Sequence, residues 1–138
     1  MQTIETKLKE ADETRKAGRS EDATALAAEA LALARQSNDP LIVAYTLRHT
    51  ANICSKTGLF DQAAVEIAEA IHIYREYGAE HALDLANALR ISALNSERRA
   101  KAAWHEAENL YASGDVQAGV NGAQHHLQHL TAALGGPS

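Results

Sequence analysis

The sequence predicts an all-α fold built from short helical hairpins, and three observations lead to that prediction. Apolar residues make up 46% of the 138 residues, and alanine and leucine, which favour helices, dominate them. β-Branched residues never alternate with polar ones for long, so no strand is expected. Glycine or proline interrupts the chain at intervals close to the length of one helix. We expect a single domain over residues 1–138, since this length can bury a core.

Turn residues divide the chain into segments of helical length. Gly18, Gly58 and Gly78 each follow a helical run, as glycine commonly does at helix C-termini, while Asp39 and Pro40 suit the start of a helix. The connections are short, so neighbouring helices should be antiparallel. The predicted helices cover residues 3–17, 20–36, 40–57, 60–77, 80–95, 97–113 and 116–134. They form hairpins over about 3–36, 40–77 and 80–113, followed by a capping helix at 116–134.

The chain repeats itself along its length. Gly18 and Gly58 are 40 positions apart, and an alanine, Ala30 or Ala70, lies twelve positions after each. A third copy of the second helix is centred on Ala107. This pattern resembles the tetratricopeptide repeat, in which helical hairpins repeat with a glycine near the end of the first helix and an alanine twelve positions later. The hairpins here are longer than the usual unit of that family, and the plain alternative is a generic helical bundle with alanine-rich seams.

The resemblance implies a right-handed superhelix of α-hairpins that binds a partner protein or peptide on its concave face. First helices line that face in this family. Arg48 and Arg90 occupy equivalent positions of the repeat, as do Lys16 and Lys56, which suggests an acidic partner or a C-terminal carboxylate. The alternative is a solvated face with charge pairs along each helix. The residues expected to contact the partner are Tyr45, Arg48, Asn52, Lys56, Asn87 and Arg90.

A specific partner is not implied. The carboxylate clamp by which some family members hold chaperone tails needs a defined set of lysine, asparagine and arginine residues. Only parts of that set appear here, chiefly Asn52, Lys56 and Arg90, so that specificity does not carry over to this chain.

The third hairpin departs from the pattern because it has no turn glycine. Between Ala82 and Ser113 there is no glycine or proline, and five residues are missing relative to the earlier repeats. Apolar residues continue at helical spacing through the expected turn, interrupted only by Glu97. Either Ser96 caps a tight turn, or residues 81–112 form one helix of about 30 residues. We favour the long helix, which would leave repeats for a second copy to complete by domain swapping in a homodimer.

Several classes of function are not expected. The formal net charge of −5 argues against a nucleic-acid partner, and no nucleophile motif, phosphate loop or dinucleotide fingerprint predicts an enzyme or a cofactor. The polar N-terminus and the lack of a long apolar stretch predict neither a signal peptide nor a membrane span. The only cysteine, Cys54, fits a buried small residue in a cytoplasmic protein.

The last helix carries a weak metal-binding candidate. His125 and His129 are four positions apart on one face and could supply two ligands. A metal site usually needs three or four, so exposed polar residues are the simpler interpretation. Trp104 is expected to anchor the core of the third hairpin or, alternatively, an interface. Besides partner binding, a self-assembling structural module and a small-ligand or metal sensor stay open as functions.

Overall fold

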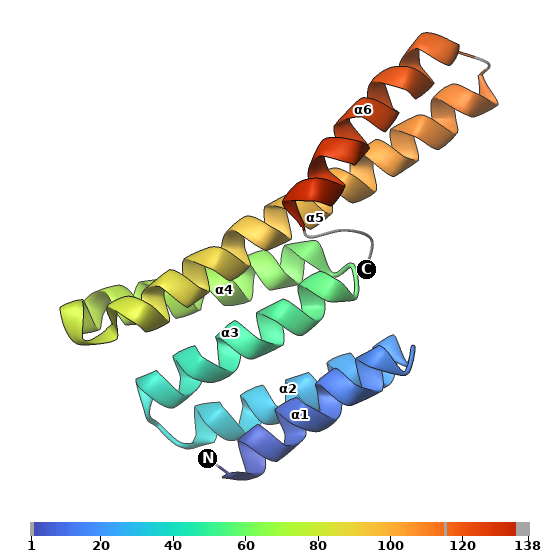
Figure 1. Ribbon diagram of the computed structural model, residues 1–138. Helices are drawn as coiled ribbons and strands as arrows, with labels where there is room; N and C mark the ends of the chain where they lie inside the picture. The colour runs from blue at the N-terminus through green and yellow to red at the C-terminus, as the bar shows by residue number, and fades with distance from the viewer. Residues whose placement is uncertain (1, 115, 135–138) are drawn as a thin grey trace. The chain divides into compact units, whose positions relative to one another are not determined.

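A computed structural model describes residues 2–114 and 116–134 of the chain, and these residues are helical apart from short turns (Figure 1). The described ranges hold no strand, so the predicted all-α class is confirmed. No helix within them combines the length and apolar character that a bilayer crossing requires. The elements are α1 (Gln2–Lys16), α2 (Ser20–Gln36), α3 (Pro40–Lys56), α4 (Phe60–Tyr77), the 3-10 helix η1 (Gly78–His81), α5 (Ala82–Ser113) and α6 (Gln117–Ala133).

The predicted turn residues lie at the ends of α1 and α3. Gly18 and Gly58 have φ values of +84° and +87°, a left-handed conformation that glycine adopts without the steric cost of a Cβ. The Asp39 carboxylate accepts a hydrogen bond of 3.0 Å from the backbone N–H of Leu41, and Pro40 occupies the first turn of α3. Because these signals are local, the predicted bounds of the first four helices agree with the structure to within one residue.

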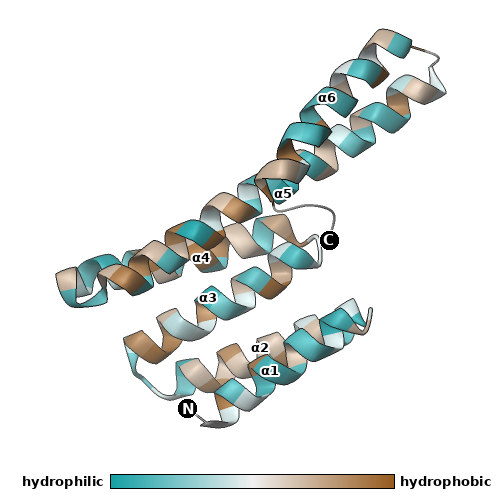
Figure 2. Ribbon diagram, in the orientation of Figure 1, coloured by the Kyte–Doolittle hydropathy of each residue, from teal (hydrophilic) through white to brown (hydrophobic). Residues whose placement is uncertain are grey.

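The chain divides into two compact units, Met1–Asn95 and Ser96–Ser138. In the first unit α1 packs on α2, α2 on α3, and α3 on α4, so that neighbours in sequence are neighbours in space. Hydrophobic and hydrophilic residues alternate along these helices (Figure 2). Ala30 and Ala70 are fully buried in one core cluster, where their small side chains permit close approach of the helices. Larger members of this cluster include Ile4, Leu8, Leu47, Ile67, Tyr74 and Ile91.

The predicted third hairpin over 80–113 does not close, and the separate helices predicted at 80–95 and 97–113 are wrong. Instead α5 is one helix of 32 residues, as the favoured alternative has it. Asn95, at the position of the expected turn, is buried and donates a hydrogen bond of 3.0 Å to the carbonyl of Phe60. It therefore fixes α5 to the start of α4 and does not reverse the chain.

The second unit contains the last part of α5 and the helix α6, whose bounds lie within one residue of the predicted capping helix. Ala123 and Leu127 of α6 are buried. The indole of Trp104 stacks on the imidazole of His126, with ring centroids 4.1 Å apart and ring planes 5° from parallel. A Cβ added to Gly119 would lie 2.4 Å from the ring of Tyr111, so glycine permits the ring to lie against the α6 backbone.

Candidate protein-binding groove

A groove of about 330 Å³ lies between the two first helices of the repeat, α1 and α3. Its residues come from positions three to four apart, or multiples of that spacing, on each helix, and therefore share one face. Leu8 and Ile53 are its buried apolar members. The polar and aromatic residues that line it are Glu5, Lys9 and Asp12 from α1, and Tyr45, His49, Asn52 and Lys56 from α3.

Three of the six residues predicted to contact a partner line this groove together. Tyr45 and Asn52 are half-buried, and Lys56 is exposed at the C-terminal end of α3. Asn52 and Lys56 also interact with other groups of the protein. An aromatic ring, an amide and an ammonium group thus follow one another along α3, and all three can contact a bound peptide.

The two predicted arginines lie elsewhere. The side chain of Arg48 is only 14% exposed, and its guanidinium lies 5.6 Å from the centre of the Tyr45 ring and 4.0 Å from the carboxylate of Asp84. Its Nε atom is buried without a hydrogen-bond partner. Arg48 therefore neutralises charge inside the first unit and does not line the groove. Arg90 is exposed and Asn87 half-buried on α5, and neither lines the groove.

The contribution of α1 was not predicted from the sequence. Glu5, Lys9 and Asp12 are spaced to share a helix face, which is the signal that could have found them. Burial raises the pKa of Asp12, but hydrogen bonds from Arg15, at 3.0 Å, and from Lys16 outweigh it and hold the pKa below its ordinary value. The Asp12 carboxylate is therefore ionised and already paired, whereas Lys9 is an exposed cation of the groove.

His49 lies within the groove and contacts Tyr45, with ring centroids 4.5 Å apart and a tilt of 57° between the rings. Burial lowers the pKa of His49, and the positive charge of Arg48 lowers it further. A neutral imidazole can donate and accept one hydrogen bond each, so at neutral pH His49 contributes a polar contact and no charge.

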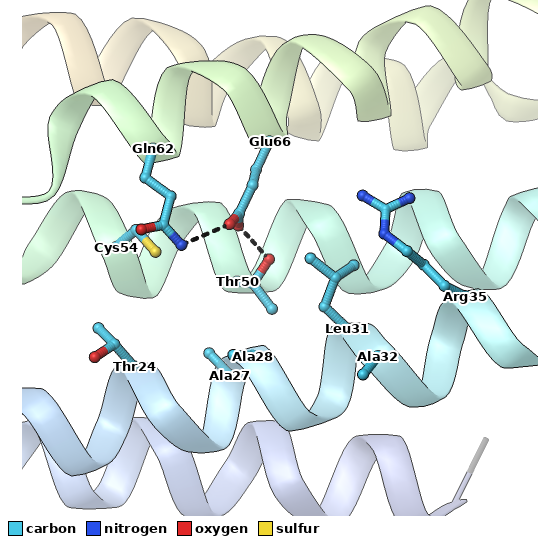
Figure 3. A pocket seen from close by; sticks show the side chains of 10 residues that line it. All are labelled: Thr24, Ala27, Ala28, Leu31, Ala32, Arg35, Thr50, Cys54, Gln62 and Glu66. Atoms are coloured by element: carbon cyan, nitrogen blue, oxygen red, sulfur yellow. Dashed lines mark hydrogen bonds between the residues drawn. The ribbon is translucent and has the colours of Figure 1, made fainter.

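A smaller depression of about 260 Å³ lies between α2, α3 and α4 (Figure 3). Three of its polar side chains form hydrogen bonds with one another. The carboxylate of Glu66 accepts hydrogen bonds from Thr50 Oγ1 at 2.5 Å and Gln62 Nε2 at 3.1 Å. Burial raises the pKa of the Cys54 thiol to about 12, with a further contribution from Glu66. The expectation that Cys54 is a buried small residue is confirmed, and its thiol stays protonated and unreactive at neutral pH.

The histidine pair of the last helix does not come together with further ligands. His125 and His129 are both exposed on α6. In the part of the chain that the structure describes, no group of three or more His, Cys, Asp or Glu residues is placed to hold a metal ion. The ring of His126, between them in sequence, is stacked on Trp104.

The chain has no match among models of known protein families, curated proteins or solved structures. The arrangement of its own residues is therefore the basis for inferring a function. The α1–α3 groove is the place where the two helices of equivalent position in the repeat bring polar, charged and aromatic side chains to one surface.

Proposed function

We propose that this chain is a protein-binding module related to the tetratricopeptide repeat proteins, and that it holds an extended segment of a partner in the α1–α3 groove. The two complete hairpins support the relationship because they are built alike. Gly18 and Gly58 share a left-handed conformation, and Ala30 and Ala70 are both fully buried. In that family the first helices line the partner-binding face, and α1 and α3 are the first helices here.

The observation that carries the proposal is the chemistry of the groove wall. Tyr45 supplies a large amphipathic contact surface at low entropic cost, Asn52 supplies amide donors, and Lys56 and Lys9 supply ammonium groups. These are the groups that bind the backbone and the carboxylates of an extended peptide.

The distribution of charge along the groove indicates how a peptide lies in it. Lys56 lines the groove at the C-terminal end of α3, whereas its equivalent Lys16, at the C-terminal end of α1, does not line the groove and is paired with Asp12 at 3.2 Å. Glu5 lies near the opposite end of α1 and would repel a carboxylate. We therefore expect the acidic group of the partner, either an Asp or Glu side chain or a terminal carboxylate, to lie at the lysine end of the groove.

Short fluorescent peptides test this proposal. One pool is rich in Asp and Glu and ends in a free carboxylate, a second has the same composition but ends in an amide, and a third is rich in lysine. Binding is measured by fluorescence anisotropy at low and high salt. We expect the first pool to bind most tightly and to weaken as salt screens the charges.

Matched variants locate the binding site. Lys56→Glu should reduce the affinity for the acidic pools, whereas Arg75→Glu, which makes the same charge change at an exposed position of α4, should affect it much less. Equal binding of the acidic and lysine-rich pools, or equal losses in the two variants, would refute the assignment of the groove.

A further inference from the structure

A buried carboxylate lies in the depression between α2, α3 and α4 without a cation beside it. Glu66 is only 9% exposed, and each of its two oxygens accepts one hydrogen bond from a neutral side chain, Thr50 or Gln62. Within the described ranges Glu66 forms no ion pair. Burial of a carboxylate is unfavourable unless hydrogen bonds and an opposite charge compensate for it, and here only the hydrogen bonds are present.

Arg35 also lines this depression, but its guanidinium is bound elsewhere. Its two terminal nitrogens donate to the two carboxylate oxygens of Glu69, at 2.9 and 3.0 Å. Such a bidentate pair satisfies both charged groups with well-directed hydrogen bonds. The charges of Arg35 and Glu69 therefore offset each other, and the charge of Glu66 leaves the depression negative overall.

The space in front of Glu66 has a polar end and an apolar wall. A carboxylate offers about four acceptor positions, and the two hydrogen bonds of Glu66 leave the others open. In Figure 3 the Glu66 side chain extends from α4 toward α2, across a volume of about 260 Å³. The residues that α2 contributes on that side are mostly small and apolar: Ala27, Ala28, Leu31 and Ala32. A ligand that fits carries a cationic donor at one end and a short apolar chain.

We propose that this depression binds a primary ammonium group on a short alkyl chain, with the ammonium at the Glu66 carboxylate and the chain against α2. An ammonium group is compact and has three donors that rotate freely, so it can reach the open positions of a carboxylate that is already partly engaged. Its alkyl chain packs on apolar surface, as the stem of a lysine side chain does. The ammonium comes either from a free small amine or from a lysine of a partner.

A titration with n-butylammonium chloride tests the proposal. Two-dimensional ¹H–¹⁵N NMR of the whole chain, at neutral pH and constant ionic strength, should show saturable shifts for backbone amides of α2 and α4 at the depression. The neutral probe n-butanol has the same chain without the charge and should bind much more weakly. Equal affinities for the two probes, or no saturable shift with n-butylammonium, would overturn the proposal.

Removal of the charge tests the role of Glu66. Glu66→Gln keeps the size of the side chain and should weaken n-butylammonium binding by about tenfold or more, since a hydrogen bond to a charged group is lost. Glu76→Gln is the matched control, because it makes the same charge change at an exposed position of α4 outside the depression. Circular dichroism checks that both variants keep their helix content. An unchanged affinity in Glu66→Gln would refute the assignment of the carboxylate.

Filling the space tests where the alkyl chain lies, without any change of charge. Ala28 is exposed and lines the depression, so the larger side chain of Ala28→Leu should occupy the place of the ligand and reduce its affinity. Ala25→Leu makes the same change at an exposed position of α2 that does not line the depression. Equal binding by these two variants would contradict the proposed position of the chain.

Two further probes distinguish the sources of the ammonium group. Tighter binding of 1,4-diaminobutane identifies a free amine as the ligand, whereas tighter binding of Nα-acetyl-lysine amide identifies a lysine side chain. Failure of both to bind would overturn the proposal. The depression shares no residue with the α1–α3 groove. Binding here should therefore be lost in Glu66→Gln and kept in Lys56→Glu, so this inference and the proposed function can fail independently.

Discussion

The two units of the molecule use similar residues with different results. In the first unit, Tyr74 of α4 joins one core cluster with residues of both α3 and α5, and it is 2% exposed. In the second unit its equivalent, Tyr111, contacts α6 and stays 42% exposed. The tyrosine at this position of the second helix is therefore buried where other helices cover it on two sides and exposed where only one does. The difference lies in the connections of the chain and not in the apolar residues themselves.

The largest expected effect is the loss of stability on truncating one leucine of an equivalent pair. Leu47→Ala removes a fully buried side chain and should lower the free energy of unfolding by about 2–5 kcal/mol. Leu89→Ala should cost much less, because the Leu89 side chain is already 41% exposed to water. Urea denaturation measures both losses, and equal losses would contradict the comparison.

The contact between α5 and α6 gives the next largest effect. The Cβ of Gly119→Ala would meet the ring of Tyr111 at 2.4 Å, so the ring must move, at a cost of about 1–3 kcal/mol. Gly122→Ala is the matched control on the same helix, with no atom within 4 Å of its Cβ. It should stabilise α6 by about 0.5–1 kcal/mol, since alanine favours helices more than glycine does. In thermal unfolding, the midpoint temperature of Gly119→Ala should fall below that of the wild type, and that of Gly122→Ala should rise above it.

His49 should make the stability of the first unit depend on pH. Burial, followed by the charge of Arg48, lowers the pKa of His49 in the folded state. As the pH falls below about 6.5, the unfolded chain takes up the proton and the folded chain resists it, so the free energy of unfolding decreases. The decrease ends once the pH passes below the lowered pKa of the folded state. His49→Gln should flatten this part of a denaturation profile measured against pH, and an unchanged slope would contradict the assignment.

The smallest effect concerns an ion pair between second helices. Arg35 and Glu69 form two hydrogen bonds, at 2.9 and 3.0 Å, in a setting that is largely open to water. The hydrogen bond from Arg35 is the main reason that the pKa of Glu69 is lowered. Glu69→Gln should therefore cost less than about 1 kcal/mol at neutral pH. The difference from wild type should vanish in acid, as Glu69 becomes protonated, and should shrink with added salt.

Much of the fold could be predicted because its signals are local. Gly18, Gly58 and Asp39 determine turns through their own backbone and side-chain chemistry, and the absence of glycine between Ala82 and Ser113 favours a continuous α5. Burial could not be predicted in this way, since Leu47 and Leu89 occupy the same position of the repeat. Whether such a residue meets another helix depends on where the chain turns back.

The candidate site was predicted only in part for a related reason. Tyr45, Asn52 and Lys56 lie on one face of α3, and that periodicity is visible in the sequence. Arg48 carries the positive charge expected of a residue that binds an acidic partner. The packing of the first unit places it beside Asp84 instead. The α1 side of the groove likewise depends on which helix lies beside α3, and spacing along one helix does not contain that information.

The order of helix contacts in the first unit has a consequence for how the protein folds. Because α1 to α4 pack mainly on their neighbours in sequence, contacts form across short loops, and topologies of this kind fold within about microseconds to milliseconds. The N-terminal hairpins can therefore form while the rest of the chain is still being synthesised. The continuous α5 interrupts that sequence of local steps. The contacts between α5 and α6 come last in chain order, so they form only after the first unit has been synthesised.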